Sequence, residues 1–427
     1  MSQLYLDAAA STPMDSAVAA AMLAVMEGSA ANPSSAHWAG RVAADLVRQA
    51  REQVGALVGA NPSSVVFTSG ATEANNLVLR GLGPLAVSSA GARSTIVSAR
   101  TEHPSVLATL KDLAACGVKV RLLDVDREGC IDLEQLRALI DETTLLVSLM
   151  AANNETGVLV NLAEIGEIAH EAGALFHTDA SQLLAWGSLP ADVDVDLVTV
   201  SAHKMHGPQG VGALVASREA RELLKPTATG GEQEGGLRSG TVNVAGVVGL
   251  GAAAGQAIDL GPGARAEVEH LRDSLHVGLI RKLAGNPSRA AHGEYPKLNG
   301  HPQARLPGVV NLAFGDVSAP IDAEAILAAA PAVAASTGSA CSAGVPGPSP
   351  VLMAMGYSTE RAESSIRFSL SRLTNPADVD EAVLAISTAI DHVALAAATT
   401  SPTPGGGWSG SSPSKQSTTG LSRVGGG

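Results

Sequence analysis

The stretch SVVFTSGATEANNLVLRGL, residues 64–82, passes from a β-branched run into a segment with helical periodicity. The same alternation continues to about Val200 through the strand-like runs STIVSA, KVRLLDV, TLLVSLMAA, ALFHTDA and DLVTVSA. Such alternation is typical of an α/β fold with a largely parallel sheet and helices on both faces. Parallel sheets bind ligands at the carboxyl ends of their strands, so we expect functional residues just after these runs.

The chain has 427 residues, more than an average single domain, so we expect two domains and a tail. The predicted large domain spans residues 15–256 and ends at a Gly/Pro-rich break. The predicted smaller α+β domain combines residues 1–14 with residues 257–396. Residues 397–427 are rich in Ser, Gly, Pro and Thr, which predicts a disordered tail.

The composition argues against several classes of partner. The net charge is -13 and no run of five or more basic residues occurs, so we expect no nucleic acid and no anionic membrane as partner. No uncharged apolar run approaches the roughly 18 residues of a membrane span, and the N-terminus does not resemble a signal peptide. The widely spaced Cys116, Cys130 and Cys341 fit a reducing compartment. We therefore expect a cytoplasmic protein without an anchor.

Two segments that end predicted strands, FHTDASQ and VTVSAHKMHGPQG, contain Asp179 and Lys204. Pyridoxal phosphate needs a lysine amine to bind its aldehyde and a carboxylate to keep its pyridine nitrogen protonated. An isolated Asp and Lys are more often a surface pair. Neighbouring polar residues favour the cofactor site instead: Gln182, Ser201 and His203.

The segment FTSGATEANN places Gly70, Ala71 and Thr72 where a strand passes into a helix. Backbone amides at a helix start, together with the Thr72 hydroxyl, can bind a phosphate. A Thr-Glu helix start by itself is usually only a cap. Beside the lysine motif, it is the expected phosphate site.

Cys341 lies in STGSACSAGVPGPSPVL, a stretch rich in Ser, Gly, Ala and Pro. This composition predicts a mobile loop with an exposed thiol that can act as a nucleophile. Cys116 and Cys130 fit the common role of cysteine as a small apolar residue.

Three further segments contain candidate residues: His103 in TEHPSV, Asn154 in MAANNETG and Arg367 in SSIRFSLSR. A single His after a strand is more often structural than catalytic. A buried arginine needs a carboxylate, which the protein or a substrate can supply.

Together these motifs resemble the cysteine desulfurases of the NifS/IscS type, within the class V aminotransferase branch of fold-type I pyridoxal-phosphate enzymes. The similarity runs from YLDAAASTP through NPSSAHWAG, LRSGTVN and STGSACS to SSIRFSLSR, over residues 4 to 395.

The resemblance implies a role for each candidate and implies no metal site. Lys204 binds the cofactor aldehyde, Asp179 pairs with the pyridine nitrogen and Gln182 approaches the phenolic oxygen. His103 stacks on the ring and handles a proton. The implied phosphate contacts are Ala71, Thr72, Ser201, His203 and Thr241. In the family, the last of these comes from the other subunit, which implies a homodimer. The implied substrate contacts are Asn32, Asn154 and Arg367, and Asn154 also adjoins the cofactor.

The implied reaction converts L-cysteine to L-alanine. Freed Lys204 removes the Cα proton, and Cys341 takes the sulfur as a persulfide for an acceptor protein or thiol, as in iron-sulfur cluster assembly. Three alternatives remain open: a selenocysteine lyase or cystine C–S lyase, an aminotransferase, and a non-catalytic scaffold. The first two would need Cys341 less or not at all, while intact Lys204, Asp179 and His103 argue against the third.

The chain departs from the family pattern at four positions. The family motif GGGQERG reads GGEQEGG here, which introduces Glu232 and Gly235. Gln209 stands where lysine is frequent, and His206 where an aromatic residue is frequent. These changes bear on the choice of acceptor and on rate more than on the reaction.

Overall fold

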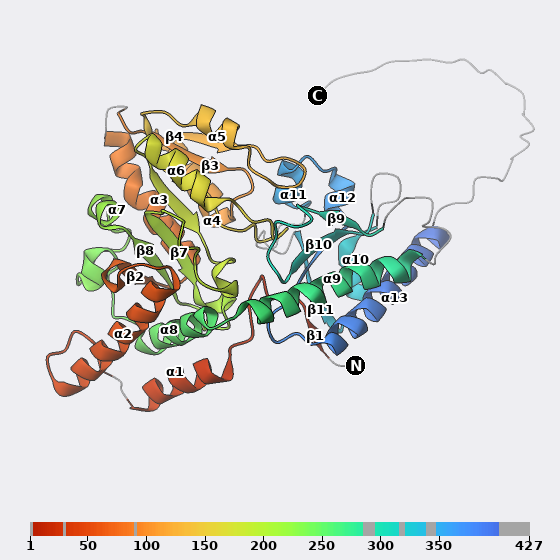
Figure 1. Cartoon of the computed structure of the whole chain (residues 1–427), viewed down its shortest axis with the longest axis horizontal. Helices are drawn as coiled ribbons and strands as arrows, with labels where there is room; N and C mark the ends of the chain where they lie inside the picture. The colour runs from red at the N-terminus through yellow and green to blue at the C-terminus, as the bar shows by residue number, and fades with distance from the viewer. Residues whose placement is uncertain are drawn as a thin grey trace, which may run out of the picture.

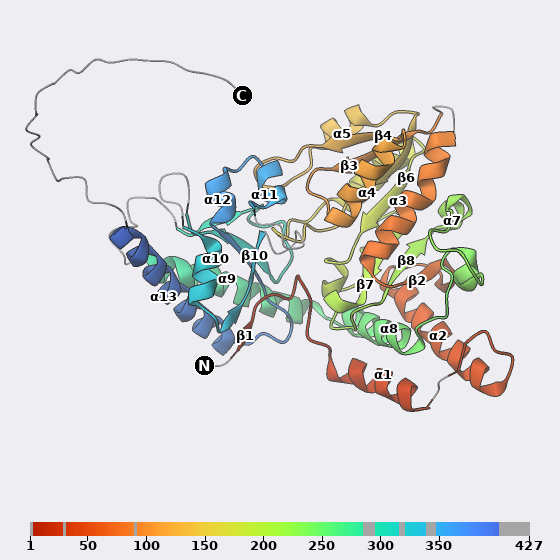
Figure 2. The same ribbon diagram turned by 180° about the vertical axis from the view of Figure 1, so that it is seen from behind.

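The structure is a computed structural model that describes residues 3–28, 31–88, 92–284, 295–315, 321–338 and 347–400. Of residues 396–400 only the backbone is described. Cys341 and the predicted tail beyond Thr400 lie outside the described residues. Figures 1 and 2 show a larger body with a central sheet beside a smaller body with two long helices, α9 and α13.

In the described part of the chain, the large body has a seven-stranded sheet. Its strands, in spatial order, are β2 (Val65–Thr68), β8 (Gly212–Ala216), β7 (Leu197–Ser201), β6 (Leu175–Asp179), β5 (Thr144–Ser148), β3 (Thr95–Ala99) and β4 (Lys119–Leu123). Pairing is parallel from β7 to β4, and β8 is antiparallel to both of its neighbours. All strands of this sheet except β8 therefore end at the same edge.

Helices cover both faces of this sheet because its side chains alternate between two apolar cores. In β2, Val65 and Phe67 join one core and Val66 joins the other. The first core includes residues of α1 (Ser16–Gly28), α2 (Trp38–Leu57), α5 (Leu133–Leu139), α6 (Leu162–Glu171) and α8 (Val244–Ile258). The second includes residues of α3 (Ala71–Ser88), α4 (Pro104–Ala115) and α7 (Arg218–Leu223). The predicted α/β fold class is confirmed.

The small body has its own sheet and core. The sheet strands, in spatial order, are β12 (Ser336–Thr337), β13 (Ser365–Ser369), β10 (Val309–Ala313) and β9 (Lys297–Asn299), with antiparallel neighbours. Near the N-terminus, β1 (Leu4–Tyr5) pairs in parallel with β11 (Val333–Ala334). The helices are α9 (Pro262–Ala284), α10 (Ala323–Ala329), α11 (Pro350–Ala354), α12 (Thr359–Glu363) and α13 (Pro376–Thr400). Short 3₁₀ turns are η1 (Pro62–Ser64), η2 (Leu184–Trp186), η3 (Ala202–Lys204) and η4 (Gln233–Gly236).

The two bodies meet where α8 gives way to α9, at an angle of 87°. Helix α8 packs against α1 and α2, whereas α9 packs against α13. Helix α13 runs to Thr400, past residue 397, where the predicted tail begins. The Ala-rich sequence that favours helix continues through residues 394–398, before the Ser/Pro/Gly-rich run begins. Within the described ranges no single helix is long and apolar enough to cross a membrane, although α8 and α9 together pass that test as a bent pair.

Candidate active site

A cavity of about 500 Å³ lies at the carboxyl edge of the seven-stranded sheet. Its wall comes from the loops after β2, β3, β5, β6 and β7, from the N-terminal segment and from β13. The predicted residues that meet there are Ala71, Thr72, His103, Asn154, Asp179, Gln182, Ser201, His203, Lys204 and Arg367. Residues distant in the sequence come together because parallel strands end at one edge.

Asp179, the last residue of β6, is 8% exposed and both of its carboxylate oxygens accept hydrogen bonds. The Asn75 side-chain amide donates to Oδ2 at 2.8 Å, and the backbone amide of Ser181 donates to Oδ1 at 3.0 Å. These donors fix the direction of the carboxylate. A fixed carboxylate is what the predicted contact with a protonated ring nitrogen requires.

Lys204 lies in the turn η3 directly after β7. Its Nζ donates to the carbonyl oxygens of Ala9 and Ala10, at 2.8 Å for Ala10. The same Ala9 carbonyl accepts from the side-chain amide of Gln182 at 2.9 Å. The N-terminal segment therefore holds the lysine at the edge of the cavity.

His103 is the N-cap of α4, where its Nδ1 accepts from the Ser105 backbone amide at 3.1 Å. Burial lowers the pKa of His103, and the charge of Lys204 lowers it further, while Asp179 opposes the shift. The imidazole that lines the cavity is therefore neutral at pH 7.

The part of the cavity wall at the start of helix α3 suits an anion. Helix α3 begins at Ala71, so its first-turn amides lie at the cavity. Burial, with Lys204, lowers the pKa of His203 to about 4. Among the described residues, the buried hydroxyls of Ser181 and Ser201 have no hydrogen-bond partner although both line the cavity. Buried hydroxyls are normally paired, so these two fit a polar ligand such as the phosphorylated cofactor.

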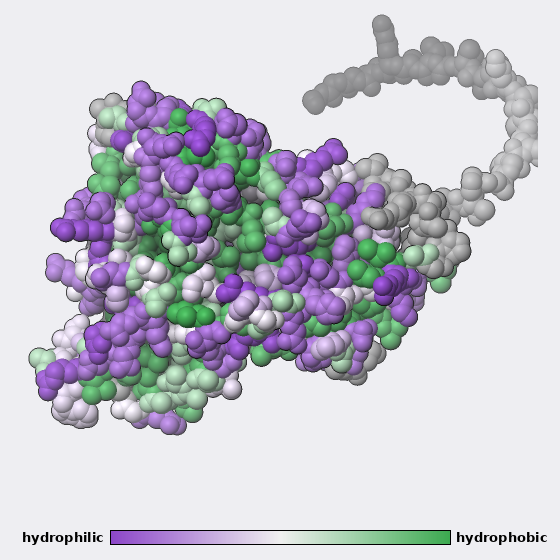
Figure 3. All heavy atoms as spheres, viewed as in Figure 1, coloured by the Kyte–Doolittle hydropathy of each residue, from purple (hydrophilic) through white to green (hydrophobic). Residues whose placement is uncertain are grey.

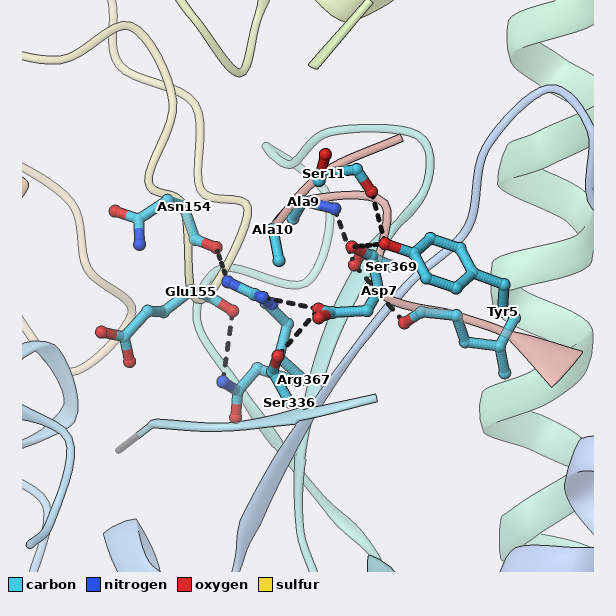
Figure 4. A network of polar contacts seen from close by, with 12 residues as sticks. Tyr5, Asp7, Ala9, Ala10, Ser11, Asn154, Glu155, Ser336, Arg367 and Ser369 are labelled. Atoms are coloured by element: carbon cyan, nitrogen blue, oxygen red, sulfur yellow. Dashed lines mark hydrogen bonds and ion pairs between the residues drawn. The ribbon is translucent and has the colours of Figure 1, made fainter. Parts of the chain in front are cut away.

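Arg367 of β13 is 3% exposed and joins the two bodies. Its Nη2 lies 2.7 Å from Asp7 Oδ1, and its Nη1 donates to the Asn154 carbonyl oxygen at 2.8 Å (Figure 4). Asp7 Oδ1 also accepts from the Ser336 hydroxyl at 2.8 Å. The predicted carboxylate-binding arginine thus already has a protein carboxylate beside it, and a substrate carboxylate must share or replace that contact.

Sequence reasoning missed the residues that hold these side chains: Asp7, Ala9, Ala10, Asn75 and Ser105. Each lies inside a motif already quoted, namely YLDAAASTP, ATEANN or TEHPSV. For Asn75 and Ser105, the signal that could have found them is a polar residue a few positions from a candidate in the same motif. Ala9 and Ala10 act through their backbone carbonyls, which the identity of the side chain does not reveal.

Two predicted residues do not line this cavity. Asn32 and Thr241 line a separate hollow of about 460 Å³, beside Val25 and Met26 of α1. Within one chain, the structure therefore brings these two residues to each other and not to Lys204. Their predicted contacts with cofactor and substrate remain predictions, as does that of Cys341.

The four departures from the family pattern have structural consequences. Glu232 adopts a left-handed backbone at φ 59°, and a Cβ on Gly235 would come 2.4 Å from Arg221 Nη2. Gln209 donates to Ser11 Oγ at 3.2 Å, and the His206 ring nitrogen Nδ1 lies 2.9 Å from the Pro13 carbonyl oxygen. Gln209 and His206 thus tie the Lys204 loop to the N-terminal segment.

One cluster of metal-ligand type lies outside this cavity. In the described ranges, Glu128, Cys130 and His301 bring one ligand atom each within 4.8 Å of the others. His301 Nδ1 accepts from the backbone amides of Gln303 and Ala304, at 3.1 and 2.8 Å. The neutral ring therefore carries its proton on Nε2, 3.5 Å from the Glu128 carboxylate, which favours a His–Glu contact over metal binding.

The family described as aminotransferase class-V matches residues 4–382, and the chain belongs to this family. Among curated relatives, the cysteine desulfurase IscS of Anaeromyxobacter sp. (strain Fw109-5) is 42% identical, over 89% of this chain and 90% of its own length. The cysteine desulfurase of Rattus norvegicus is 40% identical, over 89% of this chain and 81% of its own. The family predicted from the motifs is confirmed.

Solved structures agree with the fold. A NifS-like protein superposes with a TM-score of 0.82 at 31% identity, covering 91% of this chain and 100% of its own. A structure described as SspA in complex with cysteine has a TM-score of 0.72 at 30% identity, covering 87% of this chain and 100% of its own.

Proposed function

We propose that this chain is a cysteine desulfurase that converts L-cysteine to L-alanine with pyridoxal phosphate and keeps the sulfur on Cys341 as a persulfide. The observation that carries the proposal is the meeting of Lys204, Asp179, His103 and Arg367 in one cavity of about 500 Å³. The relatives described as cysteine desulfurases support the reaction.

The residues around the cavity fit the cofactor. Pyridoxal phosphate, when bound, supplies an electron sink for the negative charge left on the substrate Cα. Lys204 would attach it through its amine, and the fixed Asp179 carboxylate would keep its ring nitrogen protonated. The helix start at Ala71 and the buried Ser201 hydroxyl would hold its phosphate.

Substrate binding would use the Arg367 guanidinium for the carboxylate of L-cysteine. A guanidinium fork binds a carboxylate with defined geometry, and Arg367 is held rigidly between Asp7 and Asn154. The Lys204 amine, once released from the cofactor, would take the substrate Cα proton.

Sulfur transfer is a balanced two-thiol reaction. The Cys341 thiolate attacks the substrate sulfur and forms an S–S bond while the substrate C–S bond breaks. The electron pair of that C–S bond stays on carbon, which takes a proton and becomes the methyl group of alanine. Cysteine and a free enzyme thiol thus give alanine and an enzyme persulfide.

A homodimer would bring Thr241 to the phosphate site of the partner subunit. Large apolar side chains of α1 and α2 are exposed in the single chain: Leu23, Met26, Trp38 and Val42. Apolar residues gather over α1 in Figure 3, next to the hollow lined by Asn32 and Thr241. Sedimentation should show a dimer, and an active, cofactor-loaded monomer at micromolar concentration would contradict this arrangement.

We propose a cytoplasmic enzyme whose sulfur goes to an acceptor protein or thiol, with iron-sulfur cluster assembly as one destination. The scattered cysteines and the relatives named IscS support this setting.

The deciding test is Cys341→Ser, with Cys130→Ser as a matched control. The Cys341 variant should bind cofactor and cysteine yet lose alanine production by orders of magnitude, because no second thiolate attacks the sulfur. Mass spectrometry of the wild-type enzyme after cysteine should find one extra sulfur on the peptide with Cys341. Near wild-type release of alanine and sulfide by Cys341→Ser would favour a C–S lyase instead.

A further inference from the structure

A chain of hydrogen bonds links the Asp179 carboxylate to His103 through two residues outside the predicted site. The Asn75 side-chain nitrogen donates to Asp179 Oδ2 at 2.8 Å and to Ser105 Oγ at 2.9 Å. Ser105 Oγ lies 2.8 Å from His103 Nδ1. Asn75 is fully buried and Ser105 is 9% exposed, so water does not compete for these contacts.

The direction of each bond follows from the chemistry of the groups. An ionised Asp179 can only accept, so the Asn75 amide must turn its NH₂ group toward it. Ser105 Oγ accepts from the same NH₂ group, which leaves the single hydroxyl proton for His103 Nδ1. The Ser105 backbone amide points to Nδ1 as well, at 3.1 Å. Two donors therefore converge on Nδ1, and a neutral imidazole must carry its proton on Nε2.

Burial keeps the ring in this neutral form. Burial is the largest cause that lowers the pKa of His103, and Lys204 adds to it against the opposing effect of Asp179. The adjacent Glu102 carboxyl is fully buried, and burial raises its pKa to about 8, so it brings no full charge at pH 7. The tautomer of the neutral ring therefore decides what His103 can do.

We infer that Ser105 and Asn75 are positioning residues that hold neutral His103 as its Nε2–H tautomer, which makes Nε2 a hydrogen-bond donor and not a base. This inference deepens the proposed function and rests on it for the identity of the hydrogen-bond acceptor. In that reaction, the Nε2–H group of neutral His103 would donate a hydrogen bond to a substrate group rather than remove a proton from it.

The experiment measures the His103 ring directly in cofactor-free protein labelled with ¹⁵N-histidine, with His103→Gln to assign its signals. At pH 8 the long-range ¹H–¹⁵N pattern should be that of the Nε2–H tautomer. Ser105→Ala removes a donor that stabilises the neutral ring, so the pKa of His103 should rise by roughly 0.5 to 1 unit. Ser105→Thr keeps the hydroxyl and should restore the wild-type titration.

Thr109→Val is the matched control, because Thr109 is also a buried hydroxyl of α4 but bonds Asn76 and the Ser105 carbonyl rather than His103. Its His103 titration should equal that of the wild type. A wild-type ring protonated on Nδ1 would overturn the inference, and this measurement needs no variant to fold. An unchanged titration in Ser105→Ala would overturn it too.

Kinetics of the loaded enzyme give a second measurement. Ser105→Ala should lower kcat several-fold with little change in KM, because His103 acts after the substrate binds. A change in KM alone would overturn the role of His103 as a hydrogen-bond donor after substrate binding. If the desulfurase proposal fails, the wild-type enzyme will produce no alanine from cysteine. The tautomer of His103 is measured on the cofactor-free protein, so its result does not depend on alanine production.

Discussion

The two sides of the cavity are built in different ways. On the cofactor side, Asp179 and Lys204 follow neighbouring parallel strands of one sheet. On the substrate side, Arg367 comes from the small body, and it reaches Asp7 and Asn154 across 360 and 213 positions of sequence. The first side follows from sheet topology, whereas the second exists only when the two bodies and the N-terminal segment meet.

The difference has an energetic consequence. Asp179 is held by neutral donors within the large body, so a change there should weaken cofactor binding and leave the rest of the fold intact. Arg367 and Asp7 form an ion pair with 3% and 19% exposed side chains, and Arg367 also donates to the Asn154 carbonyl oxygen of the large body. Removing either partner leaves the other charge buried and should affect both substrate binding and stability.

The largest effect is expected for Lys204→Ala, which removes the amine that is predicted to attach the cofactor. The variant should lose the visible absorbance of lysine-bound cofactor and its activity by several orders of magnitude, because no other amine performs the attachment. Lys111→Ala, at an exposed lysine of α4, should behave as wild type. A borohydride-reducible link to cofactor at another lysine would contradict the assignment.

Arg367→Ala removes the guanidinium group that is predicted to bind the substrate carboxylate. We expect kcat/KM for cysteine to fall by about 10² to 10³, mostly through KM, and unfolding free energy to fall by about 3 kcal/mol from the unpaired Asp7. Arg372→Ala is the matched control, since Arg372 pairs with Asp15 outside the main cavity. An unchanged KM in Arg367→Ala would remove this residue from substrate binding.

Asn75→Ala tests the cofactor side alone, because it removes a hydrogen bond to Asp179 and to no other charged group of the site. Loss of one hydrogen bond to a charged group should weaken cofactor affinity about tenfold, measured by titration of cofactor-free protein. Asn76→Ala alters the next residue, which bonds Arg80 and Thr109, and should leave that affinity unchanged. Equal affinities of the two variants would show that Asn75 does not hold Asp179.

The smallest effect on turnover at pH 7 is expected for Glu102→Gln, because the neutral amide keeps the acceptor for the Met150 amide. Burial raises the pKa of Glu102 from 4.5 to about 8. The folded state therefore binds more protons than the unfolded state between these values, and wild-type stability is lost as pH rises through this window. Urea unfolding from pH 5 to 9 should show a growing advantage of the variant. Parallel pH profiles would contradict the buried neutral acid.

Much of the fold could be read from local patterns. Each predicted strand of the parallel sheet is present, from Val65 to Ser201, because a buried run of β-branched residues needs no distant information to be recognised. Strand β8 at Gly212–Ala216 was not predicted. Its sequence, GALVA, does not indicate that the strand lies antiparallel between β2 and β7.

The sequence by itself determined the fold class, the family and the position of Asp179 and Lys204 at one edge of the sheet, because strand ends in a parallel sheet share one edge whatever the details of packing. Only the tertiary structure decided that Asp7 pairs with Arg367, that Ser105 and Asn75 support His103, and that Thr241 lies away from Lys204 in its own chain. Apart from the local Ser105–His103 contact, those contacts join residues of separate segments, and a side chain's polarity shows that it needs a partner but not which partner the packed chain will bring.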